Sequence, residues 1–175
     1  MSIERLSIEA AGNRIWSFVL AVFAASRLFY SVAGAVIARV VPIDAWQLWS
    51  SDVPFGTLSI WAHMDGDHYL SVAQGGYSDG SPVFFPLYPL LVRVVALLFG
   101  GPISRGGLSV YGVFISLTAF CLVLYFIYRM VEEGWGTRAA RGTVLTLAFF
   151  PTSFFFNAVY TESLFLALSA GSLWA

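Results

Sequence analysis

The sequence has no lysine, one cysteine and few charged residues of either sign. Its nine basic residues are all arginine, and charged residues make up 11% of the chain, against about a quarter in a soluble domain. Nothing in it resembles a nucleic-acid-binding surface, and the lone Cys121 excludes a disulfide within the chain. Hydrophobic residues make up 58% and the mean hydropathy is +0.78. The composition therefore predicts an integral membrane protein surrounded by lipid.

Four apolar segments approach the length of about 20 residues that a membrane-spanning helix needs. The predicted spans are residues 15–41, 106–129, 141–158 and 161–175, with an outer loop at 42–105. The expected fold is an all-α, polytopic transmembrane bundle forming one domain over 1–175. The last span lacks a polar cap or a basic stop signal, so we expect the domain to continue beyond the chain.

Arginine placement predicts the orientation of these spans. Arginines gather near the N-terminus and after the second predicted span, at Arg5, Arg14, Arg129, Arg138 and Arg141. The positive-inside rule places both groups in the cytoplasm. Residues 42–82 contain acidic but no basic residues and therefore lie outside. An even number of crossings must separate the two arginine groups, so the apolar segment 83–99 is predicted to be an interfacial helix on the outer side.

The densest cluster of reactive groups is residues 61–70, WAHMDGDHYL. If it is helical, Trp61, Asp65, His68 and Tyr69 lie on one face. Partial desolvation among aromatic rings can prepare a carboxylate to act as a general base, and aromatic faces suit the apolar side of a sugar ring. The alternative is a short amphipathic helix whose Asp and His side chains simply face water.

Asp65 and Asp67 form a D-x-D pattern, which raises a divalent cation as a cofactor. The signal is weak, because positions two apart on a helix diverge by about 200 degrees. No dedicated metal site is therefore expected, with Asp67 as the weak candidate ligand.

Glu162 and Arg27 are ionisable residues at apolar segments. Glu162 is expected where the third span emerges on the outer side, as Asp65 is; it either has a function or favours the dipole of a helix capped by Thr161. Arg27 lies near the middle of the first span, where it costs about 2.5 to 3.5 kcal/mol without compensation. Its expected partner is Glu162, or failing that a lipid phosphate.

The segment 83–99 carries two further candidates. Arg93 either snorkels to the headgroups or binds a phosphate. In the string FFPLYP at 84–89, Pro86 or Pro89 is expected in the first turn of a helix, which presents Tyr88 to a glycan or lipid.

Three motifs in this order resemble the PIG-V type mannosyltransferases of the glycosyltransferase C superfamily, GT-C. They are W-x-x-x-D-x-x-H-Y-L-x-x-A-x-x-G-Y from Trp61 to Tyr77, F-F-P-L-Y-P at 84–89, and N-x-x-Y-T-E-S at 157–163. The resemblance runs from about Arg27 to the last residue. It implies a GT-C type bundle with interfacial helices in the first outer loop.

The resemblance also implies an inverting transfer of mannose from polyprenyl or dolichyl phosphate mannose to a lipid-linked acceptor, as in GPI-anchor biosynthesis. The reaction would occur on the extracytoplasmic or luminal face, at the plasma membrane of a prokaryote or the endoplasmic reticulum of a eukaryote. Asp65 matches the catalytic base and Glu162 the acidic residue of the later motif. Two departures are Met64, where many relatives have an aromatic residue, and the additional Asp67.

These roles combine into one mechanism, with a rival from another class. Asp65 is the expected base and Glu162 orients the acceptor; the phosphate ligands are His68, Arg27 and Arg93, and the sugar or lipid contacts are Trp61, Tyr69 and Tyr88. The rival is a transporter or lipid-binding membrane protein in which Arg27 and Glu162 form an intramembrane gate. It predicts solute flux without sugar transfer.

Overall fold

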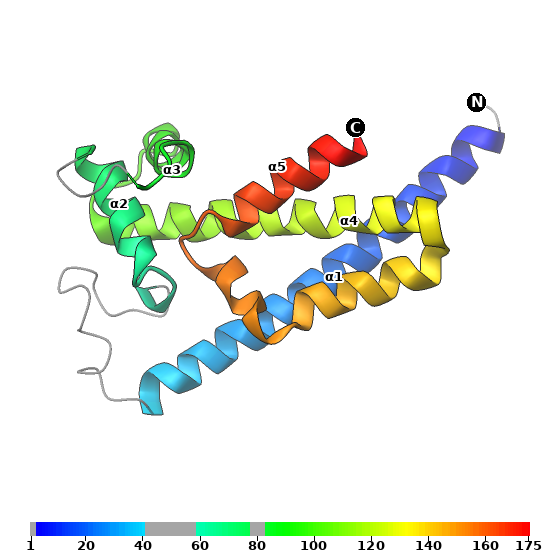
Figure 1. Ribbon diagram of the computed structural model, residues 1–175, viewed down its shortest axis with the longest axis horizontal. Coiled ribbons are helices and arrows are strands. Elements are labelled where there is room, and N and C mark those ends of the chain that lie inside the picture. The colour runs from blue at the N-terminus through cyan, green and yellow to red at the C-terminus, as the bar shows by residue number, and fades with distance from the viewer. Residues whose placement is uncertain (1–2, 41–58, 78–82) are drawn as a thin grey trace.

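The computed structural model describes residues 3–40, 59–77 and 83–175, and these residues form helices without a strand. The elements are α1 (Ile3–Val40), η2 (Ser59–Trp61), α2 (Asp65–Gly75), α3 (Leu87–Leu98), α4 (Arg105–Phe149), η3 (Pro151–Asn157) and α5 (Glu162–Trp174). Figure 1 shows α1 and α4 as the two long helices, α2 and α3 as short helices at one end, and the short α5 beside α4. The all-α expectation is confirmed for these residues, whereas the acidic segment 42–58 lies outside them.

The helix α4 contains a reversal of the chain. Gly136 has φ 81° and ψ 170°, which is not helical and which glycine adopts without steric cost. Figure 1 shows the chain turning back on itself there, so α4 is a helical hairpin. The reversal falls in the arginine-rich segment between Arg129 and Arg141, where the sequence indicated a turn.

The second half of α4 ends earlier than the predicted span 141–158. Its α-helix stops at Phe149, and Phe150 has φ −58° and ψ 140°. Pro151 explains this end, because proline has no N–H to donate and disfavours a helical conformation in the residue before it. A 3₁₀ segment, η3, follows instead.

Two helical stretches, Gly12–Val40 and Arg105–Phe149, are long and apolar enough to cross a membrane. They pack on one another around buried side chains such as Val19, Phe120 and Val144. Elsewhere large apolar side chains are exposed, among them Leu28 at 66%, Phe165 at 71% and Leu173 at 76%. Such a surface is consistent with a protein surrounded by lipid.

Arg129 and Arg141 lie near the hairpin turn of α4, whereas Asp65 and Asp67 lie at its other end, beside Arg105. At the hairpin turn, Arg129 lies over the Trp174 ring, with Cζ 5.4 Å from its centroid, and Arg141 lies 5.3 Å from that of Phe18. The carboxylates of Asp65 and Asp67 belong to α2, at the opposite end of α4 (Figure 1). The helix α3 lies beside α2 at this end, and its interfacial position on the outer side stays a prediction.

Candidate active site

Asp65 is the first residue of α2, not the middle of a longer helix. Met64, directly before it, has a positive φ of 58°, which residues other than glycine rarely adopt. Trp61 belongs to the preceding 3₁₀ turn. The predicted helical face shared by Trp61 and Asp65 was therefore wrong, because non-helical backbone at residues 62–64 separates the 3₁₀ turn from α2. Asp65 is exposed in the first turn of α2, where the helix dipole favours a negative charge.

The segment between η3 and α5 is bound to this turn. The Val159 N–H donates to the Trp61 carbonyl at 2.7 Å, and the Tyr160 hydroxyl donates to the His63 carbonyl at 3.3 Å. A Cβ at Gly66 would lie 3.3 Å from the Val159 oxygen, so the glycine permits this close approach. These contacts bring the N-terminus of α5, and with it Glu162, to the N-terminus of α2.

Asp65 and Glu162 act electrostatically on the same tyrosine. The pKa of Tyr160 is raised to about 12, first by burial and then by the negative charges of Asp65 and Glu162. Burial also raises the pKa of Glu162, and the charge of Asp65 adds to that rise, against a backbone hydrogen bond that lowers it. The two carboxylates therefore share one site.

An aromatic group borders the carboxylates. The exposed His68 stacks on Phe84 with ring centroids 4.7 Å apart, and Tyr69 meets Phe84 edge-on at 5.1 Å. The Tyr69 hydroxyl lies 3.4 Å from the Thr161 hydroxyl. Thr161 does not cap α5 with its side chain, contrary to the alternative in which it does. Residues of all three sequence motifs thus meet here.

Tyr88 is not presented to a substrate, so this expectation was wrong. Its side chain is 1% exposed, and its hydroxyl donates to the Gly112 carbonyl at 2.9 Å and lies 2.7 Å from the Ser116 hydroxyl. The reason is its position in the first turn of α3, which packs closely on α4. Pro89 occupies the same turn, as predicted, and Pro86 directly precedes it.

The Asp67 carboxylate is held in an ion pair. Arg105, at the start of α4, binds the Asp67 carboxylate and donates to the Ser71 hydroxyl at 2.7 Å. Within the described parts of the chain, no three His, Cys, Asp or Glu side chains are grouped to hold a metal ion. The sequence reasoning missed Arg105, since nothing local indicates a partner so far along the chain.

Arg93 holds the end of α2. Its Nη1 donates to the carbonyls of Ala73 at 3.0 Å and Gln74 at 2.9 Å. Carbonyls in the last turn of a helix lack partners within it, so Arg93 acts as a cap there. The arginine is exposed otherwise and retains N–H groups for a ligand.

Arg27 does not pair with Glu162, so the expected ion pair and the transport gate built on it were wrong. Its guanidinium is buried and donates five hydrogen bonds, to two carbonyls and three side-chain oxygens. A guanidinium has five N–H donors. All of them are used within the protein, which explains how the charge is tolerated in an apolar segment.

The chain is similar to two curated proteins named GPI mannosyltransferase 2. With that of Drosophila pseudoobscura pseudoobscura it is 30% identical over 123 residues, covering 67% of this chain and 27% of the relative. With that of Drosophila melanogaster it is 27% identical over 140 residues, covering 74% of this chain and 30% of the relative. The resemblance to the PIG-V type mannosyltransferases is confirmed. No family model matches the PIG-V-like chain, and no solved structure is similar to it.

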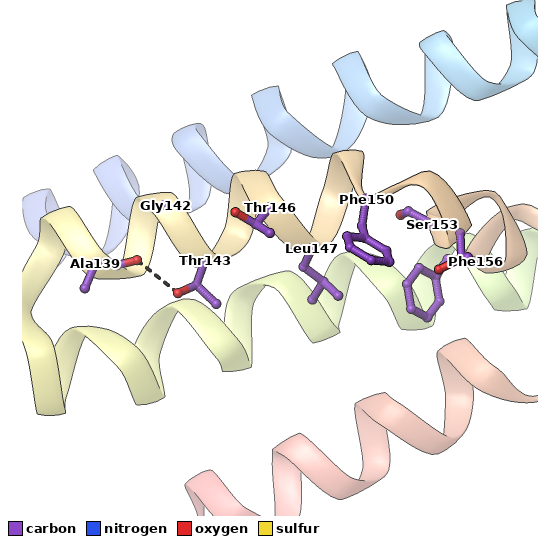
Figure 2. A pocket seen from close by; sticks show the side chains of 9 residues that line it. Ala139, Gly142, Thr143, Thr146, Leu147, Phe150, Ser153 and Phe156 are labelled. Carbon is purple, nitrogen blue, oxygen red and sulfur yellow. Dashed lines mark hydrogen bonds between the residues drawn. The ribbon is translucent and has the colours of Figure 1, made fainter.

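Two cavities of this PIG-V-like chain differ in their relation to the carboxylates. One of about 660 Å³ opens between α1, the turn before α2 and η3, and both Met64 and Tyr160 line it. The other, of about 680 Å³, follows the second half of α4 (Figure 2) and is lined by Gly142, Thr146 and Phe156 among others, with no titratable side chain. The first therefore reaches Met64, the residue directly before Asp65.

The contact between Gly66 and Val159 predicts a disulfide in the PIG-V-like chain. A Cβ on Gly66 would lie 3.5 Å from that of Val159, within the range of natural disulfides. In a full-length Cys121→Ser background, Gly66→Cys with Val159→Cys is expected to cross-link under mild oxidation, detected by mass spectrometry. Gly142→Cys with Val159→Cys is the control, because nothing lies within 4 Å of a Cβ at Gly142. Equal cross-linking of both pairs would contradict the described approach of the two segments.

Proposed function

We propose that the protein to which this chain belongs is a multi-pass membrane mannosyltransferase. It transfers mannose, with inversion, from a polyprenyl or dolichyl phosphate donor to a lipid-linked acceptor. One observation carries the proposal: in a chain similar to GPI mannosyltransferase 2, hydrogen bonds from Val159 and Tyr160 to the turn before α2 bring the N-termini of α2 and α5, with Asp65 and Glu162, together. The chain matches only 27% and 30% of the length of these two relatives, so the complete reaction is part of the proposal.

The proposed chemistry is a single displacement at the anomeric carbon. Asp65 takes the proton of the acceptor hydroxyl as the new oxygen–carbon bond forms, and the bond to the donor phosphate breaks with its electron pair leaving on the phosphate. Glu162 accepts a hydrogen bond from the acceptor and orients it. His68, in the first turns of α2 with Asp65, stabilises the departing phosphate. Arg93 caps the opposite end of α2, about 15 Å of helix from Asp65, and takes no part in this step. Trp61 and Tyr69 provide aromatic surface for the sugar.

The arginines of the hairpin turn support the proposed sidedness. Arg129, Arg138 and Arg141 flank the turn of α4, whereas Arg105 at the candidate-site end is paired with Asp67, so the positive-inside rule favours an extracytoplasmic or luminal site. Which membrane holds the protein depends on the organism, with the plasma membrane proposed for a prokaryote and the endoplasmic reticulum for a eukaryote.

The test is transfer by the purified full-length protein in lipid vesicles. Polyprenyl phosphate mannose and a mannosyl glycolipid acceptor are supplied, and the product is analysed by mass spectrometry and by the anomeric configuration of the new linkage. We expect one added hexose with the anomeric configuration opposite to that of the donor. Solute flux without transfer would support the transporter alternative, and retention of configuration would contradict the single displacement.

A further inference from the structure

We infer that Arg27 is a positioning residue, which sets where Tyr160 and Glu162 lie relative to Asp65, and not a ligand of the donor phosphate. The inference rests on the proposed function. Arg27 lies in α1, its residue is 5% exposed, and its guanidinium has no part in the chemistry proposed above.

Apart from Ser26, its neighbour in α1, the acceptors of Arg27 lie in the turn at residues 148–157, where α4 ends and η3 follows. Nη2 donates to the Ala148 carbonyl at 2.9 Å and to the Ser153 hydroxyl at 2.8 Å, and Nη1 donates to the Ser153 carbonyl at 2.9 Å and the Asn157 amide oxygen at 2.7 Å. The Nε N–H donates to Ser26 at 3.2 Å. The Ala148 carbonyl belongs to the last turn of a helix, where carbonyls lack a partner within the helix and carry partial negative charge.

A second residue of α1 reinforces the same turn. The Tyr30 hydroxyl donates to the Phe150 carbonyl at 2.7 Å. The Arg27 Cζ also lies 4.4 Å from the centroid of the Phe120 ring and 5.1 Å from that of Tyr30, which covers the guanidinium with aromatic surface. With its donors used and its faces covered, Arg27 has no group available for a phosphate.

The turn held by Arg27 leads directly into the candidate site. Asn157 is the first residue of the N-x-x-Y-T-E-S motif, and Glu162 lies five positions later. Between them the chain is not helical. It contacts α2 and the turn before it through Val159, Tyr160 and Thr161, and it contacts α4 through the Tyr160 carbonyl, which accepts from the Ser116 hydroxyl at 3.4 Å. The motif is thus anchored to α1 at one end and to α2 and α4 at the other. Without the first anchor Glu162 can shift, and a misplacement of 1 Å at a reacting centre can lower a rate about 100-fold.

The test compares Arg27→Lys with the wild type in the full-length protein. Lysine keeps the charge but has three donors at a single point, so it cannot bind the same set of acceptors. We expect kcat to fall about 10- to 100-fold with a change of less than about threefold in the KM for the lipid-phosphate donor. Arg39→Lys, in the last turn of the same helix, is the control and should retain wild-type kinetics.

A double mutant separates positioning from general damage to the fold. If Arg27 acts through Glu162, then Arg27→Lys in a Glu162→Gln background should lower kcat by less than about threefold further, because residues that act as a unit are not additive. Asn157→Leu, which removes one acceptor, is the milder second variant and should repeat the pattern with a smaller loss.

The disulfide between Gly66→Cys and Val159→Cys gives a readout that does not need transfer. Arg27→Lys should slow its formation about fivefold or more, since the 158–162 segment then occupies its place beside α2 for less of the time. A raised KM for the donor with unchanged kcat would make Arg27 a phosphate ligand, and an unchanged rate of disulfide formation would overturn the positioning role. If the wild type transfers no mannose, the proposed function fails while the disulfide rate still decides the placement.

Discussion

Asp65→Asn is expected to lower kcat for mannosyl transfer about 1,000-fold in the full-length protein, within the range of about 10²- to 10⁴-fold for loss of a general base. The amide keeps the size of the side chain but cannot take the proton of the acceptor hydroxyl. Asp65 is exposed at the start of α2, so the substitution removes no buried contact and the yield of folded protein should be unchanged. Initial rates at saturating donor and acceptor measure the effect.

Asp67→Asn is the matched control, on the same turn of the same helix. The Asp67 carboxylate is bound by Arg105, and an asparagine can still accept a hydrogen bond from it. Loss of an ion pair that is not fully buried is worth about 1 kcal/mol or less, so we expect less than a threefold change in kcat. If the two variants exchanged these results, Asp67 would be the base and the role of the ion pair would have to be reconsidered.

The helices could be predicted because they depend on composition along the chain, whereas the sidedness stays a prediction. Apolar length predicts α1 and α4, and arginine placement predicts the reversal that Gly136 makes. The same reasoning put Asp65 and Glu162 on one side of the membrane. The ends of elements were less accessible: Pro151 ends a helix that hydropathy alone continues, and the positive φ of Met64 delays the start of α2 to Asp65.

The partners of the charged residues could not be predicted, for a different physical reason. The sequence shows where a charge lies but not which oxygens surround it. Arg27 is compensated by two backbone carbonyls, two hydroxyls and the Asn157 amide oxygen, and nothing in the sequence identifies these groups as its partners. The hydroxyl of Tyr88 is bound to the backbone of α4 in the same way. An apolar or aromatic motif gives the residue types of a site, whereas the direction of each side chain depends on packing between distant segments.

Glu162→Gln is expected to lower kcat about 10- to 100-fold, a smaller loss than that of Asp65→Asn. The amide can still touch the acceptor but does not accept its hydrogen bond as strongly as a charged carboxylate. Glu132→Gln is the control: this glutamate lies near the hairpin turn, where it accepts a hydrogen bond from Thr137 at 3.1 Å. It should leave kcat within about twofold of the wild type, as is usual for surface substitutions away from the site.

The pH dependence of that loss tests the environment of Glu162. Burial and the neighbouring Asp65 charge raise its pKa above the ordinary 4.5, so its carboxyl group stays protonated to a higher pH than an exposed glutamate does. As the pH falls through the raised pKa, the wild-type side chain becomes neutral and comes to resemble glutamine. The ratio of wild-type to Glu162→Gln kcat/KM, which follows ionisation of the free enzyme, should therefore decline toward one at a pH above 4.5. Taking the ratio removes the contribution of titrating groups that the substitution leaves unchanged. A ratio that stays constant across the profile would show that the charge of Glu162 has no role in transfer.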